Sequence, residues 1–213
     1  MKFSRSWLLA VLFPFQLLAQ EGDLKKAGEF ELGMRNTIST FGSTGNTGFG
    51  FGGQFRIRLS NRINTEWFAD YFTENIDGLA NRSDYHIGWS VMFYPMDPVD
   101  KKVVPYILAG HCFDYTKIAP VYNPLTAATT QEVSRLSSAT QAGLGAHIYL
   151  TEQFNLSLSG QYMIHLGNDI HTDIHEENGH REIHIEEPEK GALSLEGHLL
   201  FTVSLNFKIG KLW

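Results

Sequence analysis

A regular alternation of apolar and polar residues runs through the last fifteen positions of the chain. From Leu199 to Trp213 the odd positions are apolar or aromatic with one exception, Lys211, and the even positions from Thr202 to Gly210 are polar or small. A period of two residues is typical of a β-strand with one apolar and one polar face. An apolar face of this length needs an equally apolar partner, and we expect lipid, because the chain also begins with the features of an export signal.

The first twenty residues predict a secretory signal peptide. A short basic region precedes an apolar stretch over residues 7–18, which is too short to cross a bilayer comfortably. We expect cleavage after Ala19, which makes residues 1–19 the signal peptide and residues 20–213 a single mature domain. The alternative interpretation of the same stretch is an uncleaved membrane anchor.

The mature chain is acidic and has one cysteine. Loss of the signal removes two of the 17 basic residues and none of the 23 acidic residues, so the net charge falls from −6 to −8. This charge excludes nucleic-acid binding, which needs a basic surface. The single Cys112 excludes an intrachain disulfide, so an exported fold must be stabilised in another way, and closure of a sheet into a barrel is one such way.

Seven earlier segments repeat the alternation of the last one. In chain order the eight segments cover residues 29–38, 49–59, 63–71, 85–93, 104–115, 141–150, 154–165 and 199–213. Since single-chain outer-membrane barrels have an even number of strands, the pattern predicts an all-β fold, an eight-stranded antiparallel up-and-down transmembrane β-barrel. The two faces of the fifth segment are ambiguous.

The connections between these segments alternate in length. Residues 60–62, 95–102 and 151–153 form the shorter connections, and residues 41–48, 73–83, 116–133 and 167–190 form the longer ones. Short periplasmic turns and long outer loops are the expected asymmetry, and both termini then face the periplasm. The alternative is a soluble lipocalin-like barrel with its apolar face turned inward. The export signal and the terminal aromatic residue favour the membrane barrel.

Several local features accompany the eight segments: Pro105-Tyr106 at the start of the fifth, the turn over residues 150–154, and a last strand that ends Asn206 to Trp213. Over essentially the whole mature chain, this combination resembles the family of small eight-stranded outer-membrane β-barrel proteins. The resemblance implies residence in the outer membrane of a Gram-negative-type cell and contact with outer-membrane lipid. It also implies that the outer-membrane assembly machinery recognises the C-terminal strand ending at Trp213.

The polar face of the segments carries charges that would point into the barrel. These inward residues are Glu29, Glu31, Arg35, Arg56, Arg58, Glu66, Asp70, His86, His147, His165, Glu196, His198 and Lys208. A tight turn at residue 61 places Arg56 opposite Glu66, and Arg58 can reach Glu31. Isolated buried charges cost several kcal/mol or more, so we expect a paired network of Glu31, Arg56, Arg58, Glu66 and Asp70.

This network has two interpretations. It either fills the lumen as a plug or borders a narrow pathway for ions or small solutes. The lumen of an eight-stranded barrel is nearly the size of its own side chains, which favours the plug.

The last outer loop is rich in histidine and acidic residues. Its Asn178-Gly179 step is a strong hairpin signal and predicts cross-strand pairs between Glu177 and His180, His175 and Glu182, Asp173 and His184, and His171 and Glu186. The histidines and carboxylates then share one face. If the hairpin extends the two flanking strands, that face turns toward the barrel axis.

Imidazole and carboxylate groups at cross-strand spacing suit Zn²⁺ or Cu²⁺. The predicted metal ligands are His171, Asp173, His175, His180, Glu182 and His184. No cofactor is required elsewhere. The alternatives for this loop are a solvated acidic segment without a ligand and a segment that responds to acid through its histidines.

An enzymatic role needs a serine nucleophile beside a histidine, as in barrels that modify lipid A. None of the nine histidines is followed two positions later by serine, although His198 could meet Ser157 or Ser159 across strands. We therefore expect no catalytic residue. The sequence favours a structural or surface-interaction role, including that of an accessory barrel in an envelope or secretion assembly. The alternative is a narrow porin-like barrel for small or hydrophobic solutes, or for metal ions collected by the outer loop.

Overall fold

The computed structural model describes residues 26–41, 47–121, 132–167, 170, 172–177, 180–185 and 197–213, so the signal peptide predicted over residues 1–19 lies outside the described residues. The described strands are β1 (Glu29–Phe41), β2 (Thr47–Arg58), β3 (Ile63–Ile76), β4 (Ala80–Phe93), β5 (Val103–Pro120), β6 (Val133–Tyr149), β7 (Phe154–Leu166), β8 (Thr172–Glu177), β9 (His180–Ile185) and β10 (Gly197–Lys211). Within these ranges, no helix is long and apolar enough to cross a membrane.

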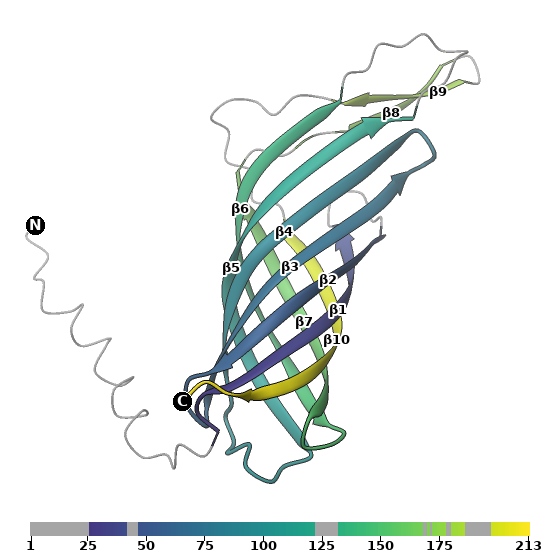
Figure 1. Ribbon diagram of the computed structural model, residues 1–213. Coiled ribbons are helices and arrows are strands. Elements are labelled where there is room, and N and C mark those ends of the chain that lie inside the picture. The colour runs from purple at the N-terminus through teal and green to yellow at the C-terminus, as the bar shows by residue number, and fades with distance from the viewer. Residues whose placement is uncertain are drawn as a thin grey trace, which may run out of the picture.

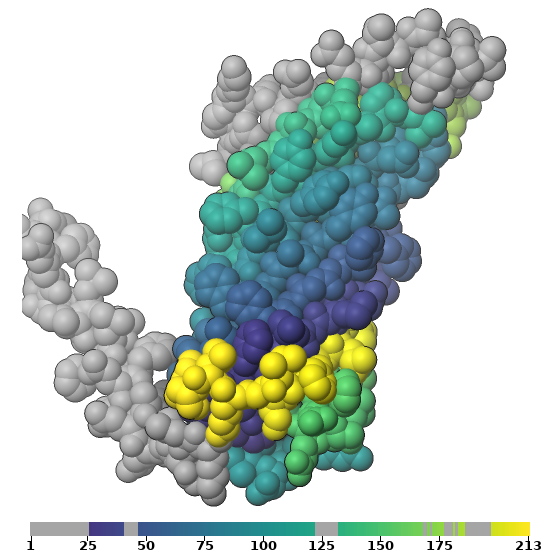
Figure 2. Space-filling model, in the orientation of Figure 1, coloured from purple at the N-terminus to yellow at the C-terminus, as the bar shows by residue number. Residues whose placement is uncertain are grey.

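Eight of the strands form a closed antiparallel barrel in the order β1-β10-β7-β6-β5-β4-β3-β2 (Figure 1). The barrel closes where the C-terminal strand β10 pairs with the N-terminal strand β1, with Met34 opposite Leu205. Figure 2 shows these two ends of the chain lying against each other on the barrel wall. The predicted eight-stranded up-and-down barrel is confirmed.

The alternation in sequence becomes an alternation between lipid-facing and lumen-facing side chains. On β10, Leu205 is 50% exposed on the outside, whereas the neighbouring Ser204 is 2% exposed inside the barrel. The other strands repeat this arrangement, with aliphatic and aromatic residues outside and most of the buried polar residues inside. A lipocalin-like barrel has the opposite arrangement, so that alternative is wrong.

The structure shows why the sequence did not distinguish the inward and outward faces of β5. Its outward residues include Ile107 and Phe113, and its inward residues include Val104, Leu108 and Cys112, so both faces are apolar. The inward apolar residues of β5 contribute to two apolar clusters within the lumen.

The outward positions also mark where the barrel leaves the membrane. Tyr71, Tyr85, Tyr115 and Leu136 lie side by side on β3, β4, β5 and β6. We call the end of the barrel that carries residues 59–62, 94–102 and 150–153 the turn end. One step further from this end, the outward residues are polar on all four strands: Thr73, Ser83, Lys117 and Ser134. A membrane-spanning strand needs only about 9–11 residues, and β5 has 18. These four strands therefore continue beyond the lipid as a sheet.

This extension corrects two predicted loops. Much of residues 73–83 is strand, because β3 and β4 meet in a tight turn at Asp77-Gly78. Part of residues 116–133 is also strand, because β5 continues to Pro120 and β6 begins at Val133. Asp77 and Gly78 both have positive φ, 52° and 74°, and the Asn75 side chain accepts a hydrogen bond of 2.6 Å from the Gly78 amide. An Asp-Gly step favours this hairpin turn, so the sequence did contain the signal.

The lipid-facing assignment of β5 can be tested with two identical substitutions. Ala109 and Ala119 both face outward on β5, the first within the apolar belt and the second beyond it. We expect Ala109→Lys to lower the unfolding free energy by about 2–4 kcal/mol, because it places a charge in lipid. We expect Ala119→Lys to change it by less than about 0.5 kcal/mol. Urea unfolding in lipid vesicles measures both, and equal effects would contradict the assignment.

Candidate functional site: the filled lumen and the outer hairpin

Five buried residues form the central charge network of the lumen, namely Glu31, Arg35, Arg56, Glu66 and Asp70. The predicted pair of Arg56 and Glu66 is present, with Nη2 and Oε2 2.6 Å apart across β2 and β3. Arg35 joins the network from β1, at 3.2 Å from the Glu66 carboxylate and 3.0 Å from the Asp70 carboxylate. Each ionic group near the barrel axis thus has an opposite charge beside it.

The predicted pair of Arg58 and Glu31 is wrong. Strand pairing places Glu31 opposite Arg56, and these side chains are 3.8 Å apart. Arg58 lies closer to the turn end, where its Nε is 3.6 Å from the Glu29 carboxylate and its Nη2 donates a hydrogen bond of 3.1 Å to the Tyr149 hydroxyl. The error arose from the register between β1 and β2, which the sequence alone did not determine.

A second cluster surrounds Asp114, which sequence reasoning missed. Its carboxylate lies 3.2 Å from His86 Nε2, 3.0 Å from His165 Nδ1 and 3.7 Å from Arg135 Nη2. The ring of His198 packs on that of His165, with centroids 4.5 Å apart. Asp114 lies on the ambiguous strand β5, and residues 134–140 of β6 were not included in a predicted strand. For that reason neither Asp114 nor Arg135 was assigned to the interior.

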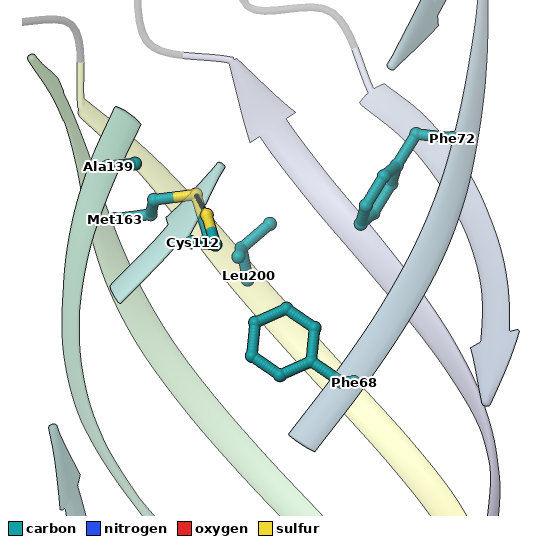
Figure 3. Packing of buried hydrophobic residues seen from close by; sticks show 6 residues of the cluster. All are labelled: Phe68, Phe72, Cys112, Ala139, Met163 and Leu200. Atoms are coloured by element: carbon teal, nitrogen blue, oxygen red, sulfur yellow. Dashed lines mark hydrogen bonds between the residues drawn. The ribbon is translucent and has the colours of Figure 1, made fainter. Parts of the chain in front are cut away.

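An apolar layer packs against both charged clusters, which adjoin where Asp70 on β3 lies directly opposite His86 on β4. The layer consists of Phe68, Phe72, Cys112, Ala139, Met163 and Leu200, which come from five strands (Figure 3). The Arg35 guanidinium packs over the Phe68 ring at 4.4 Å, and the His86 ring packs against Phe72 at 4.7 Å. The layer therefore fills the interior beside both charged clusters with buried apolar side chains.

The predicted register of the outer hairpin is confirmed where the structure describes it. Asp173 pairs with His184, His175 with Glu182, and Glu177 with His180. The pair that includes His171 lies outside the described residues, as do the side chains of His180 and Glu182. Among the side chains that are described, no group of three is arranged to hold a metal ion.

The orientation of the hairpin differs from the prediction. Strands β8 and β9 form a separate two-stranded sheet and do not extend the barrel sheet. Ile185 and Ile183 pack, together with Ile170, on a cluster of Ile76, Ala80, Ile118 and Val133 from the extended barrel strands. The isoleucine face therefore turns inward, because burial of its apolar surface is favourable, and Asp173, His175 and His184 are exposed on the opposite face.

An ion pair joins β9 of the hairpin to the turn between β3 and β4 of the barrel. Arg181 on β9 donates a hydrogen bond of 2.6 Å to the carboxylate of Asp77, in the turn between β3 and β4. Both side chains are about half exposed, so the pair stabilises the contact only weakly. The isoleucine cluster supplies the larger part of the stabilisation.

The histidine and serine positions considered for catalysis lie apart. His198 is opposite Met163, whereas Ser157 is opposite Ser204 and Ser159 is opposite Thr202. Ser157 instead contacts His147 at 2.7 Å, and it also accepts a hydrogen bond of 2.9 Å from Arg56. Both Ser157 and His147 are buried in the lumen, so this pair belongs to the polar packing of the interior.

No protein-family model matches the sequence, and no curated protein is similar to it in sequence. Solved structures are similar in fold. Neisserial surface protein A has a TM-score of 0.57 and 11% identity over 85% of this chain and 96% of its own. A major outer membrane protein from Thermus thermophilus has a TM-score of 0.58 and 10% identity over 84% and 99%. The attachment invasion locus protein Ail of Yersinia pestis has a TM-score of 0.50 and 13% identity over 86% and 99%.

Identities this low show the fold alone. Together with the apolar outer surface and the charged lumen, the fold defines the class: the protein is a small eight-stranded transmembrane β-barrel, similar in fold to small outer-membrane barrels. Its belt of aliphatic and aromatic side chains is the surface that contacts lipid.

The central charge network predicts a large difference between two carboxylate-to-amide substitutions. Glu66→Gln leaves the buried guanidinium groups of Arg56 and Arg35 without their shared carboxylate, so we expect a loss of about 3–5 kcal/mol in unfolding free energy. Asp77→Asn removes only the exposed pair with Arg181, and we expect a loss of less than about 1 kcal/mol. Urea titration in lipid vesicles compares the two variants. Similar losses would show that the network does not stabilise the barrel as described.

Proposed function

We propose that the protein is a closed membrane anchor that presents a structural or interaction surface outside the cell. The single observation that carries this proposal is the unequal length of the barrel wall. Strands β3 to β6 continue past the lipid, while β1, β2, β7 and β10, as far as the chain is described, do not form that extension with them. The hairpin β8–β9 packs on this extension and leaves its histidine and acidic face exposed.

The filled lumen supports an anchor rather than a pore. From the turn end outward, the interior holds a cluster around Tyr94 and Tyr106, the central charge network and the Asp114 cluster, with the apolar layer beside both charged clusters. The isoleucine cluster under the hairpin follows beyond them. A pathway through the barrel would require the displacement of paired buried charges, which is costly.

The proposed surface could contact two kinds of partner: another cell or surface, or the other proteins of an envelope or secretion assembly. An exposed sheet carried by a barrel suits a cell-surface contact or an accessory position in an envelope or secretion assembly. The attachment invasion locus protein has a name that describes a role of the first kind for that protein. During assembly of the barrel itself, we propose that the outer-membrane assembly machinery recognises β10 together with the exposed Trp213, two residues beyond the end of the strand.

Planar-bilayer recording tests the closed lumen. We expect the purified wild-type barrel to give no discrete openings, because paired charges and an apolar layer fill the interior. A known porin in the same bilayer is the control, since its openings show that insertion and recording work. Stepwise currents from the wild-type protein would contradict the anchor and favour the narrow porin-like alternative.

Metal capture by the hairpin is a second candidate function. The confirmed register places one histidine and one acidic residue in each of three successive cross-strand pairs on one face. Residues directly opposite each other have Cβ atoms about 4.5–5.5 Å apart, so neighbouring side chains can converge on one ion after rotation. Neutral imidazole and carboxylate groups suit Zn²⁺ or Cu²⁺.

Calorimetric titration with Zn²⁺ and Cu²⁺ tests this candidate. We expect the wild-type protein to bind one of the two metals saturably. The variant with His171, His175, His180 and His184 replaced by Ala should bind at least about tenfold more weakly, a change of about 1.4 kcal/mol. His111→Ala, on the lipid-facing side of β5, is the matched control and should bind like wild type. Equal binding by the fourfold variant would exclude the hairpin as the site.

A further inference from the structure

The barrel has a hollow at its turn end, opposite the hairpin. Its volume is about 440 Å³, within the range of about 300–1,000 Å³ that is usual for small-molecule sites. Eleven described residues line it, contributed by β1 and the residues just before it, by β6, β7 and β10, and by the turns between strands. Four of the eleven are lysines and four are acidic, so the hollow carries both signs of charge in equal number.

The floor of the hollow is acidic and has unused hydrogen-bonding capacity. Glu29 and Glu31 are only 9% and 5% exposed. The nearest cations to the Glu29 carboxylate are Arg58 at 3.6 Å and Lys208 at 3.8 Å, and within the described part of the chain no donor lies at hydrogen-bonding distance from it. Glu31 accepts one hydrogen bond of 3.2 Å, from the Asn155 amide, and Arg56 lies 3.8 Å from its carboxylate. An ionised carboxylate can accept about four, so both groups can accept more donors.

The rim of the hollow carries both signs of charge, with Lys101 and Lys102 beside the exposed Asp100 and Glu152, and backbone contacts hold it in place. Lys101 and Lys102 are exposed, and the Lys102 carbonyl accepts a hydrogen bond of 2.8 Å from the Tyr149 amide. The ammonium of Lys26 lies 4.8 Å from the centre of the Tyr149 ring. Burial, assisted by the nearby positive charge of Arg58, lowers the pKa of Lys26 below its ordinary value. An anionic group beside Lys26 would therefore be stabilising.

We propose that this hollow binds a small zwitterion, a free amino acid or a short peptide, with its ammonium on Glu29 and Glu31 and its carboxylate among Lys26, Lys101 and Lys102. A simple anion would leave the buried carboxylates of Glu29 and Glu31 without a new partner, and a simple cation would leave the lysines without one. The buried position of Glu29 and Glu31 and the exposed position of Lys101 and Lys102 set the orientation of the ligand. This site lies at the opposite end of the barrel from the surface proposed above and does not depend on it.

Amide chemical shifts of the full-length protein in detergent micelles provide the test. Alanine and dialanine are the probes, and they distinguish an amino acid from a peptide. We expect at least one of them to shift the amides of Lys102 and Tyr149 saturably. N-acetyl-dialanine lacks the ammonium and dialanine amide lacks the carboxylate. Each blocked form should bind at least about tenfold more weakly than dialanine or not at all.

Variants of the floor and the rim locate the binding. Glu29→Gln should weaken the effective probe roughly tenfold, and so should the double variant Lys101→Gln with Lys102→Gln, whose exposed side chains can change without disturbing the barrel. Lys117→Gln, on the extended outer sheet, is the control and should bind like wild type.

Three results would overturn the proposal. The first is the absence of saturation by either probe at concentrations on the order of 10 mM. The second is equal binding by a blocked peptide, which would mean that only one charge is recognised. The third is unchanged binding by the rim double variant.

Discussion

The pairing of β10 with β1 is the contact on which the rest of the structure depends. Backbone amides and carbonyls find no water in the hydrocarbon core, so a sheet survives there only when its two edges join. The register from Phe41 opposite His198 to Glu29 opposite Lys211 makes this closure along the whole of β1. Closure also fixes which face of every strand meets lipid, and it encloses the polar side chains of the other face.

Enclosure then determines what the interior must contain. Side chains in a narrow lumen have few water molecules available, so their charges need protein partners. Glu66 between two guanidinium groups and Asp114 between two imidazoles meet this requirement, with an apolar layer beside them. The interior side chains therefore pack against one another and fill the lumen. The surfaces that remain for specific contacts lie at the two ends of the barrel: the extended sheet with its hairpin, and the hollow at the turn end.

The period-two pattern was sufficient to predict the eight barrel strands, the outward face of most of them and the pair of Arg56 with Glu66. It could not reveal Asp114, because β5 is apolar on both faces and its orientation follows only from its neighbours. It placed Arg58 beside Glu31 in error, since the register between strands depends on closure of the whole barrel. The hairpin register was predictable from Asn178-Gly179, but its orientation was not, because the surface that its isoleucines cover consists of strand extensions predicted as loops.

Cysteine labelling on intact cells tests the central claim, a closed barrel that crosses the membrane with its hairpin outside. Glu176→Cys places a thiol on the exposed hairpin, Thr151→Cys places one in the turn between β6 and β7, and the native Cys112 is buried. The proposed orientation predicts that a membrane-impermeant maleimide labels Glu176→Cys on intact cells and labels Thr151→Cys only after lysis. Labelling of Thr151→Cys on intact cells, with protection of Glu176→Cys, would contradict it.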